Sequence, residues 1–177
     1  MTITELRNTL AADISAAIGI PVLLANQVQP ETKFPFAVYS VTSPYTNDGE
    51  EGDYSREDAG DTQVLNRRRE QPIASLSYTV SAIDRWADAD RTVWSYGDDE
   101  AAGLVYKMIA YLQQGGYNDL SNKGIVVVGV ENVGDRSAVE IDRTIRRYGF
   151  DVRVRYTRTD ERMDDAIAKI NVMRKGG

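Results

Sequence analysis

The chain has 177 residues, contains neither cysteine nor histidine, and carries a net charge of −6 from 27 acidic and 21 basic residues. The two absences exclude disulfides, cysteine nucleophiles, the usual zinc sites and every mechanism that needs an imidazole. No apolar run approaches the roughly 20 residues of a membrane-spanning helix, and the start lacks the basic and apolar regions of a signal peptide. We therefore expect one domain that is made in the cytoplasm and has no membrane partner.

The excess negative charge is concentrated in one segment. Residues 42–61 contain seven acids, namely Asp48, Glu50, Glu51, Asp53, Glu57, Asp58 and Asp61. Arg56 is the one base among them, so the rest of the chain carries equal numbers of acids and bases. Residues 43–70 also contain few aliphatic side chains and cannot offset their ordering entropy by burial alone. We predict that 43–70 form a long acidic loop or a hairpin arm.

The first third of the chain predicts one helix and then two strands. Apolar residues recur every three or four positions over 3–18, and Thr2 with Glu5 has the spacing of a capping box. The segment 21–27 is apolar at its centre, and 36–42 alternates with apolar groups on both faces.

The remainder predicts three strands and one further helix. Apolar and hydroxyl residues alternate over 72–84, and apolar residues recur with helical spacing over 98–113. The segments 124–133 and 141–157 have strand patterns, and Gly149 interrupts the second, which suggests a bulge.

This order of elements predicts an α+β fold, with two main helices packed on one face of a mostly antiparallel sheet. Residues 160–175 are compatible with either a short helix or an edge strand. We expect residues 1–177 to form a single domain from which the acidic segment extends.

No catalytic signature is present. The order of the acids does not match a calcium-binding loop, and there is no nucleophile elbow, phosphate-binding loop or dinucleotide-binding turn. A solvated acidic loop explains the acids better than a metal site does. We expect no enzyme, no metal and no cofactor.

Two groups of residues in the arm instead indicate assembly. Arg67, Arg68 and Arg69 adjoin the acidic segment, and opposite charges on identical copies can meet in a head-to-tail interface. Tyr45 and Tyr54 lie in polar surroundings, and tyrosine is enriched at interfaces. We predict that these five residues lie at a subunit interface.

A second basic pair lies on the last predicted strand. Arg153 and Arg155 share its polar face, where nucleic acid would be one possible contact. An ordinary solvated strand face accounts for this pair equally well.

Four blocks of the sequence resemble the neck or tail terminator family of tailed bacteriophages. They are Arg7-Asn8-Thr9-Leu10, Pro21–Thr42 with its Phe34-Pro35-Phe36, Ala74–Asp84, and Asn118–Arg155 with its Tyr148-Gly149-Phe150-Asp151-Val152. Together they cover most of the chain outside the acidic arm and the C-terminal segment. None of the blocks is a catalytic signature.

The resemblance implies a small α+β subunit of a six-fold ring that caps the tail tube and joins it to the head connector, around a channel for DNA. It implies no enzymatic activity and no cofactor. The implied partners are further copies of the chain, head connector or adaptor proteins, tail tube or sheath proteins, and DNA passing without sequence specificity. The implied location is the neck or tail of the virion, after assembly in the cytoplasm of the host bacterium.

The role of the arm does not follow from the resemblance. Because an acidic lumen repels phosphates and eases the passage of DNA, we expect the seven acids at the lumen or at a contact between rings. Two other classes of protein stay open: another head–tail joining or head-completion protein, and a nucleic-acid-binding module that uses the strand face of Arg153 and Arg155.

Overall fold

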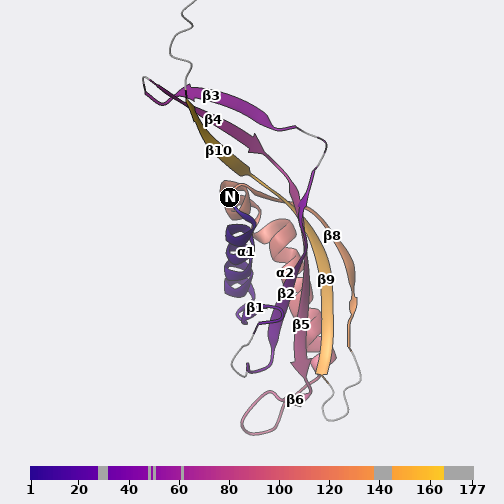
Figure 1. Ribbon diagram of the computed structural model, residues 1–177. Helices are drawn as coiled ribbons and strands as arrows, with labels where there is room; N and C mark the ends of the chain where they lie inside the picture. Colours follow the sequence, from indigo (N-terminus) through magenta and orange to yellow (C-terminus); the bar gives the residue numbers. More distant parts are fainter. Residues whose placement is uncertain (28–31, 48, 50, 61, 138–144, 166–177) are drawn as a thin grey trace, which may run out of the picture.

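The computed structural model describes residues 1–27, 32–47, 49, 51–60, 62–137 and 145–165. These residues form an elongated body, made of a sheet and helices, and a narrower arm that projects from one end of it (Figure 1).

The body is built on a five-stranded sheet. Its order is β1 (Val22–Leu24), β2 (Phe36–Thr46), β5 (Ile73–Ile83), β9 (Ile145–Tyr156) and β8 (Ile125–Asp135). β1 runs parallel to β2, and every other neighbouring pair is antiparallel. The predicted α+β class with a mostly antiparallel sheet is confirmed.

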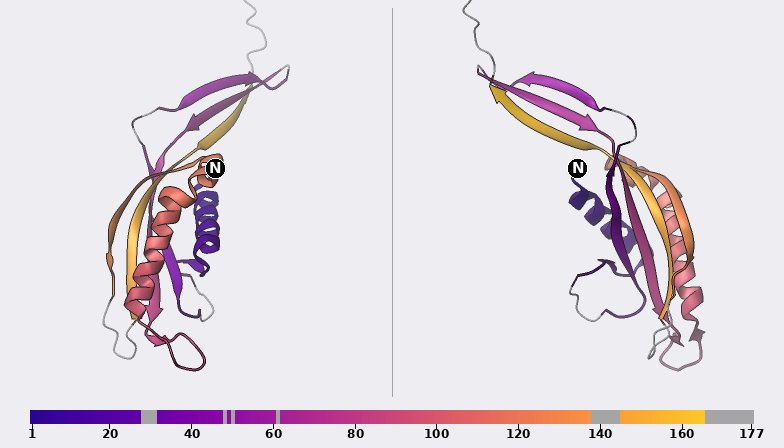
Figure 2. Two further views of the ribbon diagram at one scale, coloured as in Figure 1. Left: turned by 180° about the vertical axis from the view of Figure 1, so that it is seen from behind. Right: turned by 45° about the vertical axis from the view of Figure 1, so that its right-hand side comes forward.

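Two main helices, α1 (Ile3–Ile18) and α2 (Gly97–Ala110), cover one face of this sheet (Figure 2). Thr2 and Glu5 form the predicted capping box at the start of α1. After α2 the chain makes a π-helical turn over Tyr111–Gly115 and a short helix α3 (Tyr117–Asn122).

The apolar core lies between the helices and the sheet. Its members include Leu6, Leu10 and Ile14 of α1, Leu104, Val105 and Met108 of α2, and Leu76, Tyr78, Val80, Phe150, Val152 and Val154 of the sheet. Three rings stack across adjacent strands, with centroids 5.8 Å apart for Tyr39 and Tyr78 and 5.5 Å apart for Tyr78 and Phe150. The alternation seen in the sequence therefore separates a buried face from a polar one.

Gly149 in β9 lets the backbone of β5 and the side chain of Arg136 lie close to the backbone of β9. A Cβ atom at Gly149 would lie 2.5 Å from the carbonyl oxygen of Tyr78 and 2.8 Å from Cδ of Arg136, which crosses the polar face of the sheet there. Gly149 itself pairs regularly with β5, and the register shift lies in the neighbouring strand β8, between Glu131 and Gly134. The bulge predicted from Gly149 is thus on the partner strand.

The arm is a second, three-stranded sheet. β3 (Asp53–Asp58) and β4 (Gln63–Glu70) form an antiparallel hairpin, and β10 (Arg158–Asp165) pairs with the other side of β4. Of the alternatives predicted for 43–70 the structure shows a hairpin, but its strands begin only at Asp53, because residues 43–46 extend β2 and pair with β5 in the body sheet. Of the alternatives predicted for 160–175 it shows an edge strand up to Asp165. Residues 166–175 lie outside the described residues.

Body and arm share one long ribbon. β4 continues into β5 and β9 continues into β10, and both halves pair antiparallel, from Gln63 opposite Asp165 to Ile83 opposite Ile145. Pro72, which has no N–H to donate, stands where the ribbon passes from arm to body.

At the far end of the body, β6 (Arg85–Trp86) and β7 (Trp94–Ser95) form a small hairpin (Figure 1). Trp86 and Trp94, one on each strand of this hairpin, pack edge to face with ring centroids 5.0 Å apart.

Candidate functional site: the charged arm

The register of the arm sorts its charged side chains onto two faces. Residues directly opposite one another in antiparallel strands share a face, and neighbours along a strand alternate. On the central strand β4, Arg67 and Arg69 therefore share one face, and Arg68 and Glu70 share the other.

Arg67 holds the two outer strands to the central one. Its Nη1 lies 3.0 Å from Oε1 of Glu57 in β3, and its Nε donates to Oε1 of Glu161 in β10 at 2.8 Å. The hydrogen bond with Glu161 and the charge of Glu57 raise the pKa of Arg67. Arg67 thus has partners within its own subunit.

Arg68 is engaged on the opposite face. Its Nη2 lies 2.9 Å from Oε2 of Glu70, and its Nε donates to the backbone oxygen of Glu51 at 3.2 Å. The guanidinium also lies 5.7 Å from the centroid of the Tyr54 ring, within the range of a cation–π contact. Tyr54 itself remains 71% exposed.

Glu70 is a buried carboxylate at the junction of arm and body. The Tyr45 hydroxyl donates to its Oε2 at 3.1 Å, and Nη1 of Arg158 lies 3.4 Å from its Oε1. Partial burial lowers the pKa of Arg158, but its bonds to Asp160 and the charge of Glu70 outweigh that effect and leave the pKa raised. The cluster of Glu70, Tyr45, Arg68 and Arg158 ties the base of the arm together.

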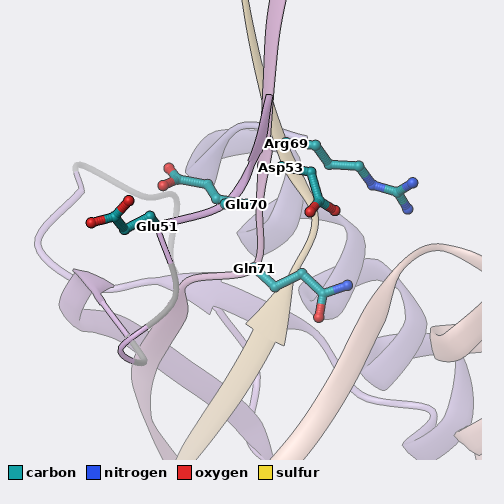
Figure 3. Close-up of a pocket in the computed structure, with 6 residues that line it drawn as sticks. Glu51, Asp53, Arg69, Glu70 and Gln71 are labelled. Atoms are coloured by element: carbon teal, nitrogen blue, oxygen red, sulfur yellow. The ribbon is translucent and has the colours of Figure 1, made fainter. Parts of the chain in front are cut away.

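A hollow of about 560 Å³ lies beside this cluster, lined by Glu51, Gly52, Asp53, Arg69, Glu70 and Gln71 (Figure 3). Arg69 and Asp53 point to one side of the strand, whereas Glu51 and Glu70 point to the other. Arg69 is exposed and forms no ion pair with any residue that the structure describes. It is therefore the member of the triplet most available to another molecule.

Gly52 lets the chain enter β3 close to the end of β4. Its φ is +83°, and a Cβ atom there would lie 2.8 Å from the carbonyl oxygen of Arg69. A larger residue at this position would combine a strained backbone with a clash against main chain.

The structure brings most of the predicted site residues into this arm. Glu51, Asp53, Glu57 and Asp58 are exposed, on β3 or just before it. Asp48, Glu50 and Asp61 lie outside the described residues. Arg67 and Arg68 have partners within their own chain, and the interface role predicted for the arginine triplet stays a prediction.

The contribution of β10 to the arm could not be predicted from the sequence. This strand adds four acids and two arginines to the arm, namely Asp160, Glu161, Asp164, Asp165, Arg158 and Arg162. Charged residues occupy both faces of the strand, so no apolar periodicity could have revealed its pairing with β4.

The other basic surface, on the polar face of the body sheet, is mixed in sign. Nη1 of Arg153 lies 3.8 Å from Oε1 of Glu131, and Nη2 of Arg136 lies 2.9 Å from Oδ1 of Asp151. Burial raises the pKa of Asp151, but hydrogen bonds from Ser77 and other neighbours outweigh it and lower the pKa, so this carboxylate stays charged. Among the described residues, acids therefore interrupt the arginines of this face.

Within the described part of the chain, no group of three or more acidic side chains could hold a metal ion. None of the helices described is long and apolar enough to cross a membrane. The arrangement of the arm, two exposed and highly charged sheet faces, suits contact with other charged surfaces.

Comparison with known proteins identifies the family. A search of curated proteins finds no match. The model of a family described as phage neck terminator protein matches residues 4–175, a span that includes the arm. The chain therefore belongs to the phage neck terminator protein family and has a structural role in the phage neck and tail.

Proposed function

We propose that the chain is the subunit of a closed ring of six copies that caps the finished tail tube and joins it to the head connector. The proposal rests on membership of the neck terminator family. It is supported by the shape of the subunit, which is elongated and carries an arm beyond its own core (Figure 1). In a head-to-tail ring each copy offers two different surfaces, and a projecting arm supplies one of them.

The observation that carries the proposal is the composition of the arm. Its three strands expose charged side chains on both faces, and the apolar core cluster contains none of their described residues. A sheet that buries so little apolar surface gains little folding free energy unless it packs against another surface. Contact with a neighbouring subunit or ring gives these charges a function.

Arg69 is the proposed centre of the subunit interface. Tyr54 and Tyr45 contribute from the opposite face of the arm, where they contact Arg68 and Glu70. Arg69 is exposed and faces away from the buried Glu70 cluster (Figure 3). Arg67 and Arg68 act by holding the arm strands in place, because their partners lie within the same chain.

The exposed acids Glu51, Asp53, Glu57 and Asp58 are proposed to face the DNA channel or an adjacent ring. Negative charge near the channel would keep phosphates from adhering during DNA passage. In this role the chain is not an enzyme and needs no cofactor. Its partners are its own copies, the head connector or adaptor proteins, and the tail tube or sheath proteins, in virions assembled in the host cytoplasm.

The direct test is the mass of the purified assembly, measured by size-exclusion chromatography with light scattering and by native mass spectrometry, with free chain and with tail tubes as template. We expect six copies, and loss of the ring in Arg69→Glu. Lys107→Glu reverses an exposed charge on α2 and serves as the matched control.

Rings that persist in Arg69→Glu would refute the interface assignment. A monomer that binds DNA in a salt-sensitive manner, and loses this binding in Arg153→Glu, would refute the ring itself.

A further inference from the structure

The outer edge of the body sheet is long and open. β8 pairs with β9 on one side, and no described strand pairs with its other side (Figures 1 and 2). Natural proteins usually protect such edges with lysine, proline or charge, because the unpaired N–H and C=O groups invite another strand. Over Ile125–Val130 this strand contains no charged residue and no proline.

The same edge exposes apolar side chains. Val126, Val128 and Val133 are 46%, 42% and 43% exposed. The register shifts of β8 lie between Val127 and Gly129 and between Glu131 and Gly134, so an added strand would begin along the regular stretch Ile125–Val127.

The end of the chain has the complementary composition. Residues 166–177 read Ala-Ile-Ala-Lys-Ile-Asn-Val-Met-Arg-Lys-Gly-Gly, with three basic residues and no acidic one. β8 carries two acids, Glu131 and Asp135, and no basic residue. In the run Ile170-Asn171-Val172 apolar side chains alternate, as a strand laid beside exposed valines requires.

Chain length favours a neighbour over the same subunit. The seven steps from Arg158 to Asp165 carry β10 about 23 Å away from the junction, at roughly 3.3 Å per residue. The start of β8 lies at that junction, because Ile125 pairs with Tyr156. Five residues beyond Asp165, Ile170 reaches at most about 18 Å. Ile170 therefore falls short of β8 in its own subunit.

We propose that residues 166–177 of one copy add as a strand to the open edge of β8 in a second copy, with Ile170 and Val172 beside Val126 and Val128. The second copy is supplied by the ring proposed above, on which this inference rests. Strand addition would pair backbone groups of β8, cover its valines and place the basic tail near Glu131 and Asp135.

Cysteine cross-linking tests the pairing without background, because the natural chain contains no cysteine. We expect the double variant Val126→Cys/Ile170→Cys to form, on oxidation, a covalent ladder of oligomers on a denaturing gel. The matched control, Asn8→Cys/Ile170→Cys, places the first cysteine on exposed α1 and should give no ladder. A disulfide-closed monomer, or no cross-link at all, would overturn the proposal.

A peptide in trans separates this inference from the ring. A labelled peptide of residues 166–177 should bind the full-length chain saturably, and Val128→Lys should weaken binding at least tenfold, whereas Val93→Lys, on the far hairpin, should not. Equal binding to all three proteins overturns the strand addition even if rings form. Binding with this dependence on Val128 supports it even if no ring is found.

Discussion

The body and the arm are both β-sheet structures, yet different interactions hold them together. The body sheet lies under two helices and buries a continuous apolar core in which Tyr78 and Phe150 are fully inaccessible. Among the described arm residues, Val64 and Glu70 are buried, and the strands are otherwise tied by ion pairs. The body is therefore stabilised by apolar burial, whereas the arm depends on charge pairing and on its three connections to the body.

This difference suggests a division of roles, in which the body provides the stability of the fold and the arm provides contacts with other surfaces. An apolar core contains no charges for salt to screen, whereas exposed ion pairs contribute little to stability and are screened as ionic strength rises. The arm can therefore change its contacts at little cost to the fold. Four substitutions or conditions test this contrast.

The largest effect is expected from Phe150→Ala in the body. Removing a fully buried ring that stacks on Tyr78 should lower the free energy of unfolding by about 3–5 kcal/mol. Urea denaturation followed by circular dichroism measures it. Tyr54→Ala, which removes an exposed ring from the arm, is the control and should leave the midpoint nearly unchanged. Equal losses would mean that the arm has a core of its own.

Glu70→Gln should act on the arm rather than on the body. The substitution leaves Arg68 and Arg158 without their shared buried carboxylate, a loss of about 1–2 kcal/mol, because both arginines are partly exposed and water can solvate them. Hydrogen exchange should accelerate over 53–70 and 158–165 and stay unchanged in β5 and β9. Glu57→Gln, on an exposed partner of Arg67, should accelerate exchange much less. Faster exchange throughout the body would show that the two regions unfold together.

Tyr78→Phe should stabilise the body. The Tyr78 hydroxyl is buried and has no hydrogen-bond partner among the described residues, so its removal should raise the free energy of unfolding by about 1 kcal/mol. Burial also raises the pKa of Tyr78, so unfolding releases a proton once the pH exceeds the ordinary tyrosine pKa, about 10. The stability is full below that pH and falls above it. Urea titrations at pH 7 and pH 11 should show a smaller fall in Tyr78→Phe, and no change from the natural chain in Tyr117→Phe, an exposed control.

The smallest effect on stability is expected from Arg67→Ala. Both ion pairs of Arg67 are solvent-exposed, so the unfolding midpoint should barely move. Hydrogen exchange over β3 and β10 should nevertheless rise, and 1 M NaCl should produce the same rise in the natural chain. Exchange in the arm that is unaffected by salt would contradict a charge-held arm.

The body could be predicted from the sequence because each of its helices and strands has its signal within one short stretch of residues. The capping box at Thr2 and Glu5 and the alternation over 72–84 located α1 and β5 to within a residue or two. Such signals arise wherever an element buries one face against a core.

The arm was only partly predictable, because its organisation depends on residues far apart in the chain. Glu161 and Arg67 form a hydrogen bond although they are 94 positions apart in the sequence, and neither β4 nor β10 shows an apolar pattern that would predict their pairing. The burial of Glu70 likewise follows from how the arm joins the body. The predicted interface role of Arg67, Arg68, Arg69, Tyr45 and Tyr54 stays a prediction.

The long ribbon gives the subunit a defined response to mechanical load. Because β4 joins β5 through Gln71 and Pro72, and β9 joins β10 through Thr157 alone, a force on the arm pulls β5 and β9 along their own length. Their ladders to β2 and β8 are then loaded in shear, so that many backbone hydrogen bonds resist together instead of opening one after another. Tension on the arm is thus transmitted into the middle of the body sheet.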